Sequence, residues 1–418
     1  MSYVPVEAGK STKIVMEKIN KGEMYIKNFL FSGKSCGLKK NADLDVGLMI
    51  SEMPLRVSAV FTKNKIKAAP VIISKSHSKN IIKALIVNSG NANACNGKYG
   101  IDDANKIILA VSKELGVAKS SIFVCSTGVI GERLNVSLVE SAIPGLIKSA
   151  NSHGMLDFAK SIMTTDTFTK IVSKDVLFNN SKYKIIGIAK GSGMIMPDMA
   201  TMLAFVFTDI PLEKELADAM FKECVETSFN SITVDGDTST NDTAAFFYPD
   251  IKQGFHKFLI KKPDVDYGPV KRALYDVCFG LAKMIVKDGE GATKLIKITV
   301  LNAYTETGAK RVAFTVANST LFKTMITGED ANWGRIMAGI GRSKVRIKPG
   351  NIDIYINNKI IVKDSVSSTN LAKDIEKTIL RPKEIDLKID LKCGKATRTV
   401  LTCNLTKDYI DINASYRS

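Results

Sequence analysis

Histidine and cysteine, which many catalytic and metal sites need, are scarce in this sequence. The histidines are His77, His153 and His256, and none of them stands in a recognisable catalytic motif. The seven cysteines are odd in number and include no Cys-x-x-Cys pair. This argues against a disulfide framework and a zinc site, and it favours a reducing compartment. A histidine-dependent triad stays open. We expect no metal ion and no cofactor.

Long apolar runs are missing as well. No stretch approaches the roughly 18 apolar residues that a membrane-spanning helix needs. Residues 1–9 lack the basic segment and apolar run of a secretory signal. We therefore expect a cytoplasmic protein that binds no membrane. A short organelle-targeting peptide stays open, although it would normally be richer in arginine.

The composition that remains is that of a globular protein. The 418 residues are 45% hydrophobic and 24% charged, which predicts two or three folded lobes. The net charge is +17, carried mainly by lysines spread along the chain. No basic block alternates with aromatic residues, so a solvated surface explains the charge better than a nucleic-acid partner does. Such a surface would still attract anionic substrates.

Helical and strand patterns alternate and indicate a mixed α and β class. Residues 85–87 and 122–124 are short apolar runs typical of buried strands. Between them a helix is predicted, with Asp102 or Asp103 as its N-cap and Gly116 at its end. Further helices are predicted over residues 211–224 and 271–286, and a hairpin is predicted with its turn at Asn357-Asn358.

Two ligand motifs begin in the sequence but are not completed. Gly9-Lys10-Ser11-Thr12 resembles the end of a phosphate-binding loop, but Val4 stands where that loop needs its first glycine. The run that begins at Asp235 resembles a calcium loop, but Thr240 replaces the glycine of the sharp turn. Neither motif predicts a site.

The segment 190–207 carries the most chemical information. It reads Lys-Gly-Ser-Gly-Met-Ile-Met-Pro-Asp-Met-Ala-Thr-Met-Leu-Ala-Phe-Val-Phe and follows a strand-like run over residues 185–189. Two glycines and a proline constrain the loop, the small Ala200 precedes Thr201, and an apolar strand follows. Taken alone, a glycine-rich turn between two strands is the better explanation of this pattern.

The segment closely resembles the processing site of the ornithine acetyltransferase family, also called bifunctional glutamate N-acetyltransferase, which is cleaved before the threonine. Ser192, Met196 and Asp198 fall at open positions of the family pattern, and every fixed position matches. Other stretches resemble the family in the same order along the chain: 88–95, 126–131, 163–167, 233–243, 288–293, 332–335 and 413–418. Ser415 and Arg417 depart from the commoner residues of the family's C-terminal tail.

The resemblance implies a fold and a division of the chain. The expected fold is α+β with mixed layers: a self-processing αββα sandwich with an N-terminal threonine nucleophile, and a smaller C-terminal lobe. Cleavage between Ala200 and Thr201 would give an α chain of residues 1–200 and a β chain of residues 201–418. We expect the two chains to stay associated, because residues 202–207 should lie in a shared core.

The resemblance also implies site residues. Thr201 would be the nucleophile, and Thr127 and Gly128 would form the oxyanion hole, since a hydroxyl and an N–H after a strand can converge on one oxygen. Lys190 would neutralise a substrate carboxylate, and Glu290 would bind a substrate ammonium group. The predicted substrate-binding residues are Thr164, Lys190, Thr201, Glu290, Asn413 and Ser418, with Thr165 as an alternative to Thr164.

The implied reaction passes through two half-reactions. N2-acetyl-L-ornithine would acylate Thr201 and release ornithine, and the acetyl group would then pass to L-glutamate. The new α-amino group, with an ordinary pKa of about 7.7–8.0, would activate the hydroxyl of the same residue. Acetyl-CoA as an additional donor stays open. The partners expected are these small molecules and the protein's own α and β chains, as a heterotetramer, without nucleic acid.

Three alternatives remain. One is a self-processed aminopeptidase or amidohydrolase of similar fold, which would pass the acyl group to water; such proteins more often carry serine at the cleavage point. Another is a nucleic-acid-binding protein, which only the net charge supports. The third is an uncleaved, inactive paralogue.

Overall fold

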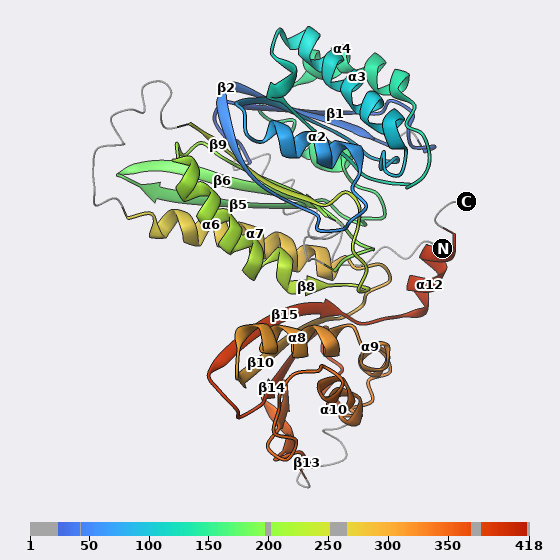
Figure 1. Ribbon diagram of the computed structural model, residues 1–418, viewed down its shortest axis with the longest axis vertical. Coiled ribbons are helices and arrows are strands. Elements are labelled where there is room, and N and C mark those ends of the chain that lie inside the picture. Colours follow the sequence, from blue (N-terminus) through green and yellow to red (C-terminus); the bar gives the residue numbers. More distant parts are fainter. Residues whose placement is uncertain (1–23, 42, 197–201, 251–265, 369–377, 416–418) are drawn as a thin grey trace. The chain divides into compact units, whose positions relative to one another are not determined.

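The computed structural model describes residues 24–41, 43–196, 202–250, 266–368 and 378–415. The chain forms two compact units. The first consists of Met1–Asn230 and Asp237–Ile285, and the second of Ser231–Gly236 and Val286–Ser418. Each unit contains one sheet with its own helices, as the mixed α and β prediction requires (Figure 1).

The first unit contains an eight-stranded sheet in the order β4-β3-β2-β9-β7-β6-β5, with β1 also paired to β2. Its strands are β1 (Phe29–Lys34), β2 (Val46–Phe61), β3 (Ile82–Asn88), β4 (Ile122–Ser126), β5 (Lys170–Phe178), β6 (Ser181–Lys190), β7 (Leu203–Thr208) and β9 (Thr243–Pro249). The long strand β2 pairs with β3 through its first part and with β9 through its second part. It therefore joins two halves of the sheet.

These two halves face each other across an aromatic core. Phe29 of β1 contacts Phe207 of β7 with ring centroids 5.5 Å apart, and Phe123 of β4 contacts Phe247 of β9 at 5.6 Å. Such contacts need the two half-sheets to be stacked, because each pair joins strands of different halves. The interior of the first unit is therefore a layer between two β-layers.

Helices cover the outer faces of both halves. The helices of the first unit are α2 (Ala69–His77), α3 (Gly97–Leu115), α4 (Val136–Ser149), α5 (Met155–Ser161), α6 (Lys214–Thr227) and α7 (Gly268–Lys287). Apolar residues of α3 and α4 pack on β2, β3 and β4. Phe221 of α6 packs on Phe246 of β9, and Gly187 of β6 lets Val277 and Leu281 of α7 approach closely. Figure 1 shows α3 and α4 on one side and α6 and α7 on the other, which confirms the predicted αββα sandwich.

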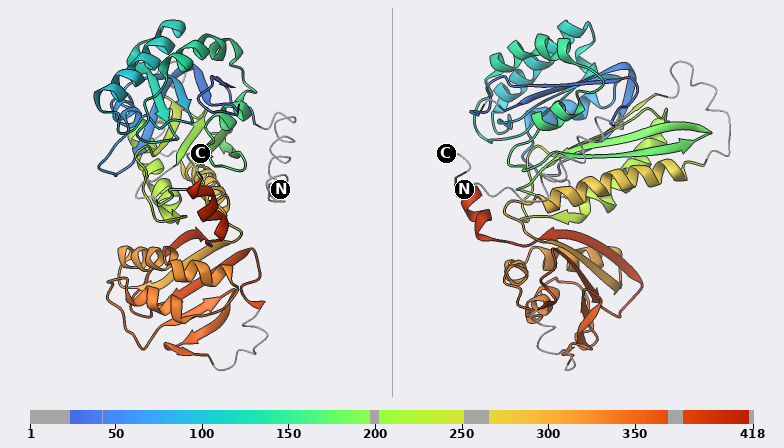
Figure 2. Two further views of the ribbon diagram at one scale, coloured as in Figure 1. Left: turned by 90° about the vertical axis from the view of Figure 1, so that its right-hand side faces the viewer. Right: turned by 180° about the vertical axis from the view of Figure 1, so that it is seen from behind.

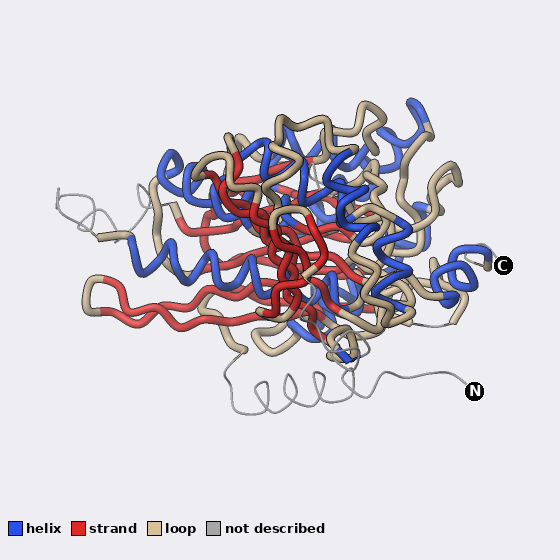
Figure 3. Tube along the Cα trace, turned by 90° about the horizontal axis from the view of Figure 1, so that it is seen from below, coloured by secondary structure: helices blue, strands red, loops and turns tan. Residues whose placement is uncertain are grey.

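Strands β5 and β6 form a long hairpin with nine residue pairs. Figure 3 shows the hairpin among the strands in red, and the rear view in Figure 2 shows α7 running along it. The last residue of β6, Lys190, pairs with Leu203, the first residue of β7. The segment that connects β6 to β7 therefore begins and ends at two residues that are paired in the sheet.

The predicted helices exist, but some boundaries differ. Helix α3 ends as expected at Gly116, which has a φ of 65°. The prediction that Asp102 or Asp103 caps its start is wrong, because the helix begins at Gly97. Asp103 is buried in the second turn and pairs with Arg133 at 3.3 Å. Helix α6 begins at Lys214, three residues after Pro211.

The second unit contains a seven-stranded sheet in the order β13-β12-β11-β14-β10-β15-β8. Its elements are β8 (Ile232–Thr233), β10 (Leu295–Ala303), α8 (Glu306–Ala317), α9 (Thr320–Thr327), α10 (Gly334–Gly341), β11 (Asp353–Ile356), β12 (Lys359–Lys363), β13 (Val366–Ser367), β14 (Glu384–Asp390), β15 (Ala396–Cys403) and α12 (Lys407–Ala414). The predicted hairpin is present, with Asn357 and Asn358 at φ values of 48° and 65° in its turn. No helix within the described ranges is long and apolar enough to span a membrane.

Candidate active site

The predicted site residues of the first unit gather where several strands begin or end. Asn88 and Ser126 are paired at the ends of β3 and β4, and Lys190 ends β6. Leu203 and Thr243 are paired at the starts of β7 and β9. Asn241 joins the two halves of the sheet here, since its Nδ2 donates to the carbonyl oxygens of Ala92 at 2.6 Å and of Ser126 at 2.8 Å.

Lys190 is the centre of a buried polar cluster. Its side chain is 5% exposed. Its Nζ donates to Oγ1 of Thr164 at 2.6 Å and to Oγ1 of Thr127 at 3.3 Å. The structure thus brings Lys190 together with two threonines that lie 26 and 63 positions before it in the chain. Of the two candidate threonines, Thr164 is the one whose hydroxyl contacts this ammonium group.

Asp166 ties the cluster together, and the sequence analysis did not identify it as a site residue. Its Oδ1 accepts hydrogen bonds from Lys170 Nζ at 2.6 Å and from the Gly191 N–H at 2.7 Å. Its Oδ2 accepts from the Thr164 N–H at 3.0 Å and lies 4.0 Å from Lys190 Nζ. Burial alone would raise the pKa of this carboxyl, but the two ammonium groups and the Gly191 N–H hold the pKa well below its usual range. Asp166 is therefore an ionised carboxylate.

Gly128 occupies a position that only glycine can fill. Its φ is +133°, and a Cβ there would lie 2.3 Å from the carbonyl carbon of Gly90. Its neighbour Thr127 donates its N–H to the Asn88 carbonyl oxygen at 2.9 Å, which fixes the turn after β4. The Thr127 hydroxyl and the Gly128 N–H thus belong to a rigid turn, as an oxyanion hole requires.

A second loop contacts the segment that carries Thr164. The buried carboxylate of Asp45 accepts four backbone N–H groups, those of residues 36–39, at 2.7–3.1 Å. In that loop Lys39 Nζ donates to the carbonyl oxygen of Met163 at 2.7 Å, directly before Thr164. Burial lowers the pKa of Lys39. Lys39 and Asp45 are further residues that the sequence analysis missed, because no motif marks them.

The second unit holds two other predicted substrate-binding residues in contact. Nδ2 of Asn413 in α12 donates to Oε2 of Glu290 at 2.7 Å. Glu290 is 8% exposed and follows Asp288-Gly289, where a turn begins after α7. The C-terminal tail is helical up to Ala414, and Asn413 orients the carboxylate of Glu290.

Three predicted residues, Ala200, Thr201 and Ser418, lie outside the described residues. Met202, which follows the predicted nucleophile, is described and buried. Its N–H donates to Oδ1 of Asp242 at 3.0 Å. The position of the chain just after Thr201 is therefore fixed by a buried carboxyl group.

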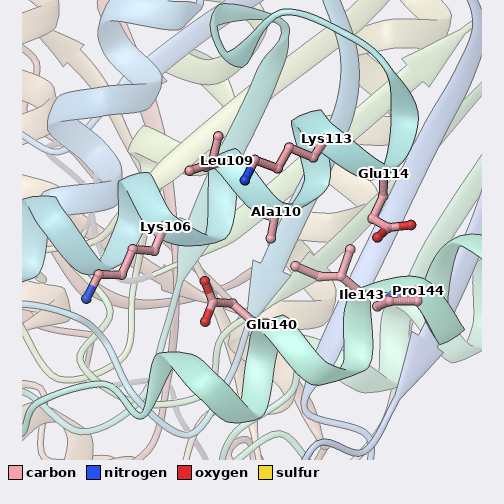
Figure 4. A pocket seen from close by; sticks show the side chains of 8 residues that line it. All are labelled: Lys106, Leu109, Ala110, Lys113, Glu114, Glu140, Ile143 and Pro144. Carbon is pink, nitrogen blue, oxygen red and sulfur yellow. The ribbon is translucent and has the colours of Figure 1, made fainter.

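The surface hollow between α3 and α4 contains none of these residues. It is lined by Lys106, Leu109, Ala110, Lys113, Glu114, Glu140, Ile143 and Pro144 (Figure 4). Across the described ranges, no group of three or more His, Cys, Asp or Glu side chains is arranged to hold a metal ion. The cluster of Lys190, Thr127 and Thr164 is the candidate site of the first unit.

The αββα layers and this buried cluster at the strand ends suit an enzyme of the acyltransferase class, and the family match supports that class. Residues 30–418 match the ArgJ family. The arginine biosynthesis bifunctional protein ArgJ of Geobacter sulfurreducens is 41% identical over 396 residues, which cover 94% of this chain and 100% of that protein. The chain belongs to the ArgJ family, and it is an enzyme of arginine biosynthesis.

Two solved structures show a partial similarity. A crystal structure of the arginine biosynthesis bifunctional protein ArgJ from Bacillus halodurans is 36% identical, with a TM-score of 0.47, and covers 52% of this chain and 100% of that one. The ornithine acetyltransferase of Mycobacterium tuberculosis, complexed with ornithine, is 32% identical, with a TM-score of 0.39, over 42% of this chain and 93% of that one.

Proposed function

We propose that this enzyme transfers the acetyl group of N2-acetyl-L-ornithine to L-glutamate through an acetyl ester on Thr201. The observation that carries the proposal is the contact of Lys190 with the hydroxyls of Thr164 and Thr127. A buried ammonium group beside a rigid oxyanion turn suits a substrate that carries both a carboxylate and an acyl group. The ArgJ relatives have arginine biosynthesis in their names, which fits these two substrates.

Chain connectivity supports Thr201 as the nucleophile. Lys190 and Leu203 are paired residues of β6 and β7. Residue 201 precedes Leu203 by two positions, so it is close in the chain to the residue that pairs with Lys190. Cleavage between Ala200 and Thr201 would create an α-amino group with an ordinary pKa of about 7.7–8.0, which can accept the hydroxyl proton near neutral pH. The base and the nucleophile would then lie on one residue.

The sheet would hold the two products of cleavage together. Strand β6 belongs to the proposed α chain of residues 1–200, and β7 and β9 belong to the β chain of residues 201–418. Six residue pairs join β6 to β7, and seven residue pairs join β2 to β9. We propose that the paired chains assemble further as a heterotetramer.

In the first half-reaction, Thr201 Oγ attacks the acetyl carbon and the α-amine takes its proton. The oxyanion is stabilised by the Thr127 hydroxyl and the Gly128 N–H, and ornithine leaves with the returned proton. In the second half-reaction, the amine of L-glutamate attacks the acetyl carbon, the bond from that carbon to Thr201 Oγ breaks, and a proton of the attacking amine returns to Oγ through the α-amine. Lys190 binds the carboxylate of either amino acid, and Thr164 orients Lys190. Glu290, with Asn413 and Ser418, stays the predicted contact for a substrate ammonium group.

The direct test follows the acetyl group. Purified protein is incubated with N2-acetyl-L-ornithine and L-glutamate, and ornithine, N-acetylglutamate and free acetate are quantified. We expect ornithine and N-acetylglutamate in equal amounts, and neither product from Thr201→Ala. Free acetate in place of N-acetylglutamate would instead show the hydrolase alternative. A parallel reaction with acetyl-CoA and L-glutamate tests the second donor.

A further inference from the structure

One buried asparagine of the second unit holds the loop that carries Glu290. Asn404 directly follows β15 and is 2% exposed. Its Oδ1 accepts the N–H groups of Thr293 and Lys294, both at 2.9 Å. Its Nδ2 donates to the hydroxyl of Thr293 at 2.8 Å and to that of Thr327 in α9 at 3.0 Å. All four hydrogen-bonding positions of this amide are therefore used, and three of them fix the end of the loop.

The start of α12 holds the middle of the same loop. Thr406, the residue before this helix, donates its hydroxyl to the Gly291 carbonyl oxygen at 2.7 Å. Gly291 has a φ of +66°, and a Cβ there would lie 2.7 Å from the nitrogen of Tyr409. The backbone of α12 therefore packs directly on the residue after Glu290, in a contact that needs glycine.

The carboxylate that this arrangement places has no cation partner in the second unit. Glu290 is 8% exposed, and its Oε2 accepts a hydrogen bond from Nδ2 of Asn413 at 2.7 Å. Among the residues that the structure describes, no lysine or arginine forms an ion pair with Glu290. Acidic side chains buried to this extent are rarely left without a charged partner. Glu290 is therefore suited to receive a cation from a bound molecule.

We propose that Asn404 and Thr406 are positioning residues for donor specificity, because they fix the loop in which Glu290 meets the side-chain ammonium group of the donor. This inference rests on the proposed function, since it takes Glu290 as the contact of that group. Loops are more mobile than the elements they connect, and a misplacement of about 1 Å can abolish much of an interaction. Four hydrogen bonds from side chains that lie 110 to 115 positions later in the chain restrict this loop.

The contribution of the ammonium group can be measured with a donor that lacks it. N2-acetyl-L-norvaline has the carbon chain of N2-acetyl-L-ornithine without the side-chain amine. The specificity ratio, defined as kcat/KM for acetylornithine divided by kcat/KM for acetylnorvaline, therefore reports the ammonium contact alone. A residue that only stabilises the fold should lower both values together, whereas a residue that positions Glu290 should lower the ratio.

The test determines this ratio for the purified enzyme and its variants, with L-glutamate as the acceptor and N-acetylglutamate as the measured product. We expect Glu290→Gln to lower the ratio roughly 10- to 100-fold, as the loss of a hydrogen bond to a charged group does. Asn404→Ala should lower it about 10-fold, which lies within measured couplings between residues of one hydrogen-bond network. Thr406→Val breaks one neutral hydrogen bond and should lower it about 3-fold.

Asn357→Ala is the matched control in the second unit. Asn357 also joins two segments, since its Nδ2 donates to the Ile379 carbonyl oxygen at 2.8 Å and its Oδ1 accepts the Asp386 N–H at 2.9 Å. It stands in the turn between β11 and β12 and not in the loop of Glu290. We expect this variant to keep the specificity ratio of the unmodified enzyme, even where its free energy of unfolding is lower.

Each result decides the inference. A lower ratio for Asn404→Ala supports it if Asn357→Ala keeps the ratio and if Asn404→Ala causes no further fall when combined with Glu290→Gln. An unchanged ratio for Asn404→Ala beside a lowered ratio for Glu290→Gln overturns it and leaves the proposed function standing, as does a further fall in the double variant. An unchanged ratio for Glu290→Gln overturns both the inference and the predicted contact of Glu290. If Asn404→Ala does not fold, Thr406→Val decides by the same outcomes.

Discussion

The surroundings of Asp166 and Asp242 differ, although both carboxyl groups are buried in the first unit. Asp166 accepts hydrogen bonds from Lys170, Gly191 and Thr164. Asp242 accepts from Met202, and its second oxygen has no partner among the described residues. Electrostatic contacts lower the pKa of the first, and burial raises the pKa of the second. The surroundings of each carboxyl group, and not the residue type, therefore favour the ionised form of Asp166 and the protonated form of Asp242.

The largest effect in this comparison is expected from Asp166→Asn. Lys170 and Lys190 would lose the negative charge that they share, and both of their side chains are at most 5% exposed. Removing one partner of a buried ion pair costs about 3–5 kcal/mol. We expect the free energy of unfolding to fall by this amount, measured by urea denaturation of the unmodified and variant proteins.

An exposed ion pair of the same hairpin provides the control. Asp175 lies 3.4 Å from Lys184, and its side chain is 83% exposed. Asp175→Asn should change the free energy of unfolding by less than about 1 kcal/mol, because water screens such pairs. Similar losses in Asp166→Asn and Asp175→Asn would show that the buried carboxylate does not organise the cluster.

A smaller effect is expected from Lys190→Met, which removes the charge that faces both carboxyl groups. The variant loses the hydrogen bonds to Thr164 and Thr127 and the proposed contact with the substrate carboxylate. Hydrogen bonds to charged groups contribute about 1.5–3 kcal/mol, so kcat/KM for N2-acetyl-L-ornithine should fall roughly 10- to 100-fold.

Lys182→Met is the comparison on the same strand, since Lys182 is exposed. It should keep the kcat/KM of the unmodified enzyme in the same steady-state assay. Equal kcat/KM values for the two lysine variants would show that Lys190 does not bind the substrate.

The smallest expected effect is on the pH dependence of the free energy of unfolding, to which Asp166 and Asp242 contribute with opposite signs. Asp166, whose pKa is lowered, contributes stability that is present above the unfolded pKa of about 3.9 and is lost as the pH falls through its folded value. Asp242, whose pKa is raised, contributes stability that is complete below about 3.9 and is lost as the pH rises through its folded value.

Urea denaturation across a pH series measures both. Relative to Asp242→Asn, the unmodified protein should lose stability as the pH rises from about 4. Relative to Asp166→Asn, it should lose stability only as the pH falls below about 4. Parallel curves for the three proteins would show that the two carboxyl groups do not differ in charge.

The sequence predicted the elements better than their contacts. Gly116 marked the end of α3, and Asn357-Asn358 marked a hairpin turn, because these residues tolerate positive φ. The start of α3 was misplaced, since Asp103 pairs with Arg133 across the fold and does not cap the helix. A capping signal is local, whereas that ion pair depends on tertiary packing.

The same distinction applies to the site. The motif resemblance identified Thr127, Thr164 and Lys190, which the structure places in contact. It gave no role to Asp166, whose partners Lys190 and Gly191 reach it only when the β5–β6 hairpin closes. It gave no role to Asp242 either, because a buried oxygen without a hydrogen-bond partner is visible only in three dimensions.

The most direct test of the account is the intact mass of the purified protein, before and after incubation with N2-acetyl-L-ornithine without L-glutamate. We predict two chains that separate between Ala200 and Thr201, and an added mass of one acetyl group on the chain that begins at Thr201. Adding L-glutamate should then remove that mass. A single full-length mass in the unmodified protein, or two chains without an acetyl group on the second, would contradict the proposed acetyl-enzyme.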